Sequence, residues 1–242
     1  MQFTYKAYEN LVTLLRRYNY TICSYHNYQQ AEKSVILRHD IDLQIEKAVK
    51  MAKLEHDMNV SSTYFVLVSS NFYNIFSKRN QDGLRQICQL GHAVGLHFDE
   101  AKYEEKETDM VWAMEQEAAL LEQCLGREVR SLSMHRPSPK TLEADYAIAG
   151  GRIVNSYGAE FFRSHKYVAD SRRNWREDVV QIIESGKYDR LHVLTHPFWY
   201  EDEEESASDE LKRFCTNRGR QCYDDLSDNI RDLAEFLRKE DI

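Results

Sequence analysis

Short runs of consecutive apolar residues alternate along most of the chain with longer segments in which apolar residues recur every three or four positions. The runs predict buried strands, and the longer segments predict amphipathic helices. We expect strands over residues 34–40, 62–68, 93–98, 129–134 and 190–195, with less regular strands near 152–156 and 166–169. We expect helices over residues 5–18, 44–58, 72–90, 109–125, 139–149, 177–185 and 206–239.

Several helix ends carry the residues that usually mark them. Gly91 and Gly126 follow predicted helices, where glycine is the favoured residue of the C-terminal cap. Thr108 precedes the helix that ends at Gly126 and is its expected N-cap. The last helix is expected to present one apolar face, made of Leu226, Ile230, Leu233 and Leu237.

The order of these elements indicates the fold class. Strands that alternate with helices are typical of an α/β protein with a parallel sheet, and the length suits a single barrel. Because no linker, low-complexity tract or repeat interrupts the pattern, we expect one domain over residues 1–242. In such folds the functional groups gather at the carboxyl ends of the strands.

Composition narrows the classes of partner and the compartment. The 242 residues carry a net charge of -8 and form no basic stripe, so a nucleic-acid partner is not expected. The five cysteines show no Cys-x-x-Cys spacing, which favours a reducing compartment. The N-terminal residues Met1–Lys6 lack an apolar signal core, and no stretch of about 18 apolar residues predicts a membrane-spanning helix. We therefore expect a cytoplasmic protein.

The segment Arg38–Asp42, which reads Arg-His-Asp-Ile-Asp, is the first candidate for chemistry. It follows a buried strand and precedes a helix. Asp40 and Asp42 are two residues apart and face the same side of an extended chain. Two carboxylates so near each other repel unless a cation binds between them or one of them takes up a proton. The alternative interpretation is a helix N-cap beside a surface acid.

Histidines gather at the predicted strand ends. A single histidine there is usually structural, but several parallel strands bring their ends to one rim. Imidazole nitrogen and carboxylate oxygen are ligands that a zinc-like ion prefers. The histidines at or beside strand boundaries are His39, His92, His97, His135 and His196, whereas His26, His56, His165 and His192 have no predicted role.

Five elements, in order, resemble the motifs of the polysaccharide deacetylases of the NodB homology type, carbohydrate esterase family 4. They are Arg38–Asp42, Gly91–His97, His135–Pro137, Val168–Ser171 with Trp175 nearby, and Leu194–Pro197. The resemblance extends from about residue 34 to residue 200. It implies a distorted (β/α) barrel of about seven parallel strands.

The resemblance also implies roles for individual residues. Asp40 is the catalytic base and Asp42 a metal ligand, and His97 is a second metal ligand. His196 is the general acid. Arg136 lines the substrate groove and is oriented by Asp170 through an ion pair, for which an ordinary structural pair is the alternative. The neighbouring aromatic residues stack on a sugar ring or belong to the core; they are Trp175, Phe198, Trp199 and Tyr200.

The sequence departs from the family pattern at one metal position. The family's second metal histidine lies four residues after the first, and here that residue is Ala101. A third ligand must therefore come from elsewhere. His135 is the first candidate, because it ends a neighbouring strand, and Asp99 is the second. The remaining alternative is a relative that binds no metal tightly.

The implied activity is a divalent-metal-dependent hydrolase, with zinc as the expected ion, that removes an N- or O-acyl group from a sugar. An intracellular member suggests a role in surface-polysaccharide (lipopolysaccharide O-antigen or capsule) biosynthesis, acting on a nucleotide sugar or a lipid-linked sugar. The alternatives are a non-catalytic carbohydrate-binding relative and a hydrolase of small non-sugar amides. Neither the oligomeric state nor the identity of the acyl group follows from the sequence.

Overall fold

The structure is a computed structural model that describes residues 1–103 and 109–242. The chain divides into two compact units, Met1–Tyr200 and Glu201–Ile242. The first unit contains all strands and all the candidate site residues. The expectation of a single domain over residues 1–242 stays a prediction.

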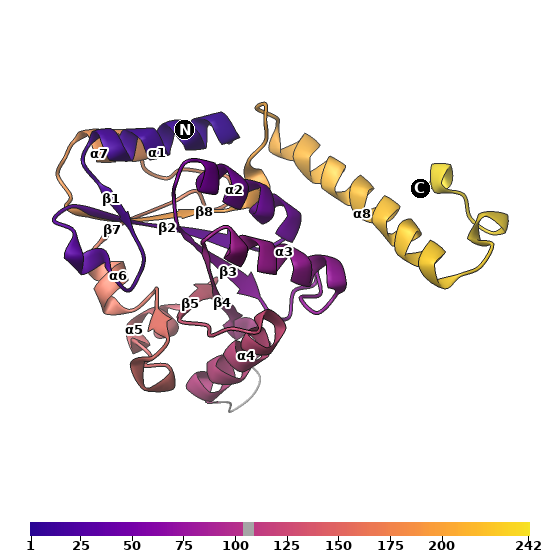
Figure 1. Cartoon of the computed structure of the whole chain (residues 1–242), viewed down its shortest axis with the longest axis horizontal. Coiled ribbons are helices and arrows are strands. Elements are labelled where there is room, and N and C mark those ends of the chain that lie inside the picture. Colours follow the sequence, from indigo (N-terminus) through magenta and orange to yellow (C-terminus); the bar gives the residue numbers. More distant parts are fainter. Residues whose placement is uncertain (104–108) are drawn as a thin grey trace. The chain divides into compact units, whose positions relative to one another are not determined.

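The first unit is built on one parallel sheet, as the β-α alternation predicts (Figure 1). Its strand order is β6-β5-β4-β3-β2-β8-β7, and all the pairings are parallel. A further strand, β1, pairs with the first three residues of β2. The bounds are Thr21–Cys23 (β1), Ser34–Ile41 (β2), Thr63–Leu67 (β3), Ala93–Asp99 (β4), Ser131–His135 (β5), Val154–Asn155 (β6), Lys166–Ala169 (β7) and Arg190–Thr195 (β8).

The sheet curls into a distorted barrel, which confirms the predicted fold class. In the described part of the chain, no ladder joins the two terminal strands, β6 and β7. Side chains meet across this opening instead: the hydroxyl of Tyr157, just after β6, lies 3.4 Å from that of Tyr167 on β7. A side-chain contact therefore bridges the edge that backbone hydrogen bonds leave open.

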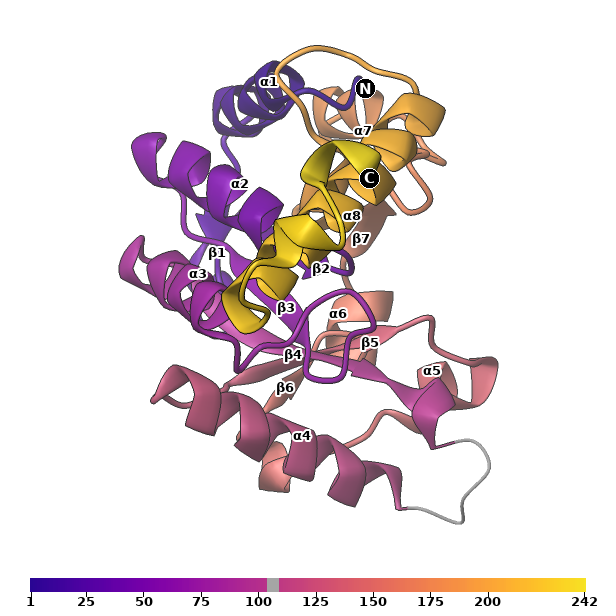
Figure 2. The same cartoon turned by 90° about the vertical axis from the view of Figure 1, so that its right-hand side faces the viewer.

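Helices α1 to α4 lie along one side of the sheet (Figures 1 and 2). The helices of the first unit are Tyr5–Arg17 (α1), Ile45–Asp57 (α2), Lys78–Gln89 (α3), Met110–Leu125 (α4), Pro139–Ala144 (α5), Ala159–Arg163 (α6) and Val179–Glu184 (α7). The second unit contains α8, Ala207–Asn229. No helix in residues 1–103 or 109–242 is long and apolar enough to cross a membrane.

Several details differ from the sequence prediction, and one is that the helix expected over residues 139–149 ends at Ala144. Helix α3 begins at Lys78 and not at residue 72, because Ser69 and Asn74 form an antiparallel bridge and the Asn74 carbonyl accepts hydrogen bonds from Ser77 and Asn80. The short elements β1 and α6 were not predicted. Asp109 caps α4, and the predicted cap Thr108 lies outside the described residues. Helix α8 ends at Asn229, so Ile230, Leu233 and Leu237 do not extend its face.

Strand β2 separates two layers of core. Val35, Leu37 and Ile41 belong to the large apolar cluster between sheet and helices. Ile36 packs with Phe65 in a smaller cluster. Because side chains alternate along a strand, the even-numbered residues of β2 face the interior of the barrel. This alternation aims the next even-numbered side chains at the site described below.

Candidate active site

The five residues expected to form the site lie around one cleft. It has a volume of about 790 Å³ and is lined by the side chains of Asp40, Asp42, His97, His135 and His196, among others. They come from the ends of four neighbouring or near-neighbouring strands, β2, β4, β5 and β8. The parallel sheet therefore brings together residues that are up to 156 positions apart, as the prediction requires.

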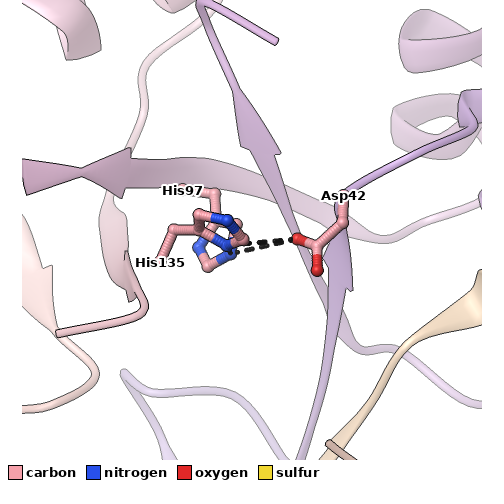
Figure 3. Close-up of side chains that lie close together, drawn as sticks. All are labelled: Asp42, His97 and His135. Carbon is pink, nitrogen blue, oxygen red and sulfur yellow. Dashed lines mark hydrogen bonds and ion pairs between the residues drawn. The ribbon is translucent and has the colours of Figure 1, made fainter. Parts of the chain in front are cut away.

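Asp42, His97 and His135 form a cluster of potential metal ligands (Figure 3). Nε2 of His97 lies 3.3 Å from Oδ1 of Asp42 and 3.1 Å from Nδ1 of His135. Nδ1 of His135 lies 3.5 Å from the same Asp42 oxygen. Ligands at about 2.1 Å from a tetrahedral zinc ion would be about 3.4 Å from one another. The three atoms therefore have the spacing of a zinc ligand set.

The surroundings of these atoms also suit a cation. Oδ1 of Asp42 is buried and accepts no hydrogen bond from any residue that the structure describes. Burial would raise the pKa of Asp42, but His97, His196 and His135 outweigh it and hold that pKa below its usual range. Burial and the neighbouring His97 lower the pKa of His135, which favours the neutral imidazole that metal ions need. The residues present fit a divalent ion.

Asp40 is held by an arginine from its own strand. Nη2 and Nε of Arg38 donate to the two carboxylate oxygens of Asp40, at 2.7 and 3.2 Å. Arg38 is fully buried, and its remaining hydrogen bonds go to the hydroxyls of Ser133 and Ser156. Burial alone would raise the pKa of Asp40, but Arg38, followed by His97 and His196, lowers it. Asp40 is therefore an ionised carboxylate with a fixed orientation.

His196 is held by Asp170. Nδ1 of His196 lies 2.6 Å from Oδ1 of Asp170, whose carboxylate also accepts the backbone N–H of His196 and the hydroxyl of Tyr200. Burial would lower the pKa of His196, but Asp170, Asp42 and Asp40 together raise it to about 9. His196 therefore carries a proton on both nitrogens at neutral pH, and its Nε2 faces Asp42 at 3.9 Å.

The expected ion pair between Asp170 and Arg136 is wrong. Asp170 is completely buried and its carboxylate is used by His196 and Tyr200. Arg136 instead lies 3.3 Å from Asp99, and its side chain is 72% exposed. Asp99, the second candidate for the third metal ligand, is therefore paired with Arg136, while His135 lies in the ligand cluster.

The two tryptophans expected to bind substrate differ in position. Trp199 lines the cleft beside His196. Trp175 is not among the lining residues, and its indole N–H is buried with no hydrogen-bond partner in the described part of the chain. The geometry therefore makes Trp199 available for stacking on a ligand from the open cleft.

His39 and His92, both at predicted strand boundaries, lie on the other side of the sheet. They approach the buried carboxylate of Glu55 on α2, with His39 Nε2 at 3.0 Å and His92 Nδ1 at 3.6 Å. Tyr8 and Tyr64 also donate to Glu55, at 2.5 and 2.7 Å. These two histidines belong to a buried structural network, here called the Glu55 cluster.

Sequence reasoning overlooked Arg38 as a site residue. The same two-residue period that places Asp40 and Asp42 on one side also places Arg38 there. A buried arginine two residues before a carboxylate on one strand face was the available signal. Its other two partners could not be read from the sequence alone, because the hydroxyls of Ser133 and Ser156 come from β5 and from the residue after β6.

Comparison with solved structures supports the fold. A carbohydrate esterase family 4 (CE4) esterase from Streptococcus mutans is 16% identical, with a TM-score of 0.50 over 71% of this chain and 77% of that one. The chain has the fold of the CE4 esterases. No family model and no curated protein sequence matches it.

Two further solved structures resemble the chain less closely in shape. A family 4 carbohydrate esterase from Bacillus anthracis is 14% identical, with a TM-score of 0.47 over 87% of this chain and 86% of that one. A CE4 family pseudoenzyme from the same organism is 16% identical, with a TM-score of 0.43 over 79% of this chain. The chain spans 64% of the length of that pseudoenzyme.

Proposed function

We propose that this protein is a divalent-metal-dependent hydrolase that removes an N- or O-acyl group from a sugar. The observation that carries the proposal is the convergence of a ligand cluster, an ionised carboxylate and a protonated imidazole on one cleft. Fold alone does not determine activity, so the proposal depends on the arrangement of these groups.

Asp42, His97 and His135 would hold the ion. Its chemistry there would be to lower the pKa of a coordinated water and to polarise an acyl carbonyl. The chain's own contribution is to favour the neutral imidazole of His135 and the ionised carboxylate of Asp42, the states in which these two groups can coordinate a metal ion.

Asp40 and His196 would divide the proton transfers between them. Asp40 is ionised and would accept a proton from the attacking water as the water oxygen bonds to the acyl carbon. The bond between that carbon and the sugar nitrogen or oxygen then breaks, and His196 gives its Nε2 proton to the departing amine or alcohol. Asp170 keeps the His196 imidazole charged until that step, because its carboxylate accepts a hydrogen bond from Nδ1 of His196 at 2.6 Å.

The substrate class is part of the proposal. The cleft is open enough for a sugar, and Trp199 lines it where a ring can stack. We infer an intracellular role in surface-polysaccharide (lipopolysaccharide O-antigen or capsule) biosynthesis, on a nucleotide sugar or a lipid-linked sugar, with zinc as the ion. This finer inference rests on the sequence resemblance and on the chemistry of the ligand set.

Acyl release measures the proposed activity directly. The purified protein is incubated with N-acetylated, N-formylated and O-acetylated sugars, with added zinc and with a chelator. We expect release that requires the metal and falls at least about 100-fold in Asp40→Asn and in His196→Ala. His56→Gln, at an exposed histidine whose ring bonds the Leu90 carbonyl, is the matched control and should stay active.

Other outcomes would assign the site differently. Sugar binding that is unchanged by Asp40→Asn, with no release from any member of the panel, would make the protein a carbohydrate-binding relative. Release from small non-sugar amides but from no sugar would make it an amide hydrolase. If neither the native protein nor His97→Ala contains or needs a divalent ion, the metal site itself is refuted.

A further inference from the structure

The cleft carries positive charge that its own carboxylates do not balance. Its lining includes Arg136, Arg172 and Arg176. Of the lining carboxylates, Asp40 is neutralised by Arg38 and Glu177 by Lys166, at 2.7 and 2.6 Å. Asp42 faces the histidines of the ligand cluster. In a protein of net charge -8, this is a local excess of cations.

Arg172 and Arg176 are the least satisfied of these groups. Both are exposed, and neither side chain has a hydrogen-bond or ion-pair partner among residues 1–103 and 109–242. Arg136 has one partner, Asp99 at 3.3 Å. Guanidinium groups that line a cleft without carboxylate partners are free to bind an anion that enters it.

The backbone at two of these arginines is in a conformation that side chains rarely adopt. Arg136 has a φ of 52° and Arg172 a φ of 60°, both in the left-handed region that favours glycine. Such conformations cost stability and are concentrated at ligand-binding sites. Arg136 and Arg172 both line the cleft.

We propose that the substrate carries an oxyanion, a phosphate or a carboxylate, and that Arg172 and Arg176 bind it, with Arg136 lining the same cleft. The proposal deepens the proposed deacylase function and rests on it. Phosphate and carboxylate each offer two oxygens that can accept parallel hydrogen bonds from one guanidinium group. An oxyanion bound there would place the attached acylated sugar in the cleft that holds Asp40 and His196.

Calorimetric binding to the zinc-loaded full chain tests the proposal apart from turnover. The probes are N-acetylglucosamine, N-acetylglucosamine 1-phosphate and N-acetylmuramic acid, which bear no charge, a phosphate and a carboxylate. We expect at least one charged probe to bind at least about tenfold more tightly than the neutral sugar, and less so at high salt. The charged probe that binds more tightly shows whether the site prefers a phosphate or a carboxylate.

The double variant Arg172→Gln/Arg176→Gln should remove this preference, while Arg17→Gln, at an exposed arginine on α1, should keep it. Equal binding of all three probes would overturn the proposal. A preference that survives in the double variant would also overturn it, because a group other than Arg172 and Arg176 would then be binding the charged probe. If the preference depends on the two arginines but no acyl group is released, the anion site stands and the deacylase function fails.

Discussion

Arg38 determines the charge state of the floor of the cleft. Its guanidinium satisfies both oxygens of Asp40 and two serine hydroxyls, and it is completely buried. Removing one partner of a buried ion pair leaves the other charge without compensation, which costs more than the pair contributes. Arg38 is thus a positioning residue for Asp40 and not a spare surface charge.

We predict that Arg38→Met lowers the free energy of unfolding by about 3–5 kcal/mol. The physical reason is that Asp40, which is buried, must then stay charged without its arginine partner or take up a proton. Urea denaturation measures the change. The double variant Arg38→Met/Asp40→Leu removes both charges and should be more stable than the single variant. A double variant that is no more stable than Arg38→Met would show that the pair is not coupled.

The third metal ligand is the second prediction at the level of single residues. His135→Ala should weaken zinc binding at least about 100-fold, since the loss of even an outer hydrogen-bond partner costs about 10–100-fold. Asp99→Asn should leave zinc affinity unchanged, because Asp99 pairs with Arg136 and lies outside the ligand cluster. Competition with a chromophoric chelator measures both. If His135→Ala keeps its zinc affinity and Asp99→Asn loses it, Asp99 and not His135 is the third ligand.

At the scale of elements, the Glu55 cluster ties α2 to β2, β3 and α1. The carboxylate accepts hydrogen bonds from Tyr8 on α1, Tyr64 on β3 and Ser62, and it faces His39 on β2. Burial would raise the pKa of Glu55, but His39 and His92 lead the groups that lower it from 4.5 to about 2. The ionised form is therefore the one that the fold stabilises.

This lowered pKa predicts how stability depends on pH. A group whose pKa falls on folding stabilises the protein fully above its unfolded value, and the contribution is lost as the pH drops towards the folded value. Glu55 should contribute about 3 kcal/mol near neutral pH, of which about 2 kcal/mol is lost by pH 3. Urea denaturation of the native protein and Glu55→Gln at pH 6 and pH 3 should show their difference shrinking by that amount. A constant difference would mean that Glu55 does not titrate in this range.

Local patterns predicted most of the elements because strands and helices repeat with fixed periods. Strands β2, β3, β4, β5, β7 and β8 and helices α1, α2, α4 and α7 lie where the apolar spacing indicates. The start of α3 was wrong because Ser69 and Asn74 pair in a loop whose sequence still reads as helical. The predicted pairing of Asp170 with Arg136 was wrong because the partners of these residues depend on which strand ends meet. No local sequence pattern records that.

For the whole molecule, the β-α alternation and the strand-end residues were sufficient to predict a parallel barrel with one cleft. What they could not predict is how charge is shared around it, since Lys166 and Asp170 pair with residues 11 and 26 positions away in the sequence. The unbalanced arginines became visible only after those pairs were known.

The division into two units leads to the last prediction. Residues 1–200 contain every strand and every residue of the candidate site, and they end at Tyr200, which is fully buried and donates to Asp170 at 3.1 Å. We expect a chain that ends at Glu205 to fold cooperatively and to bind zinc like the full chain. Its melting temperature should fall by no more than about 4 °C, the equivalent of about 1 kcal/mol.

A chain that ends at Phe198 is the matched comparison, because it lacks Tyr200 and the backbone carbonyl that accepts from Lys47. It should lose several kcal/mol of stability, since the Tyr200 ring packs against Phe3 and Tyr8 and removing a buried aromatic ring costs about 3–5 kcal/mol. Differential scanning calorimetry of the full chain and of the chains ending at Glu205 and Phe198 measures these differences in stability. If the chain ending at Glu205 is unfolded, the two units fold only together, and residues 1–242 form one domain as the sequence predicts.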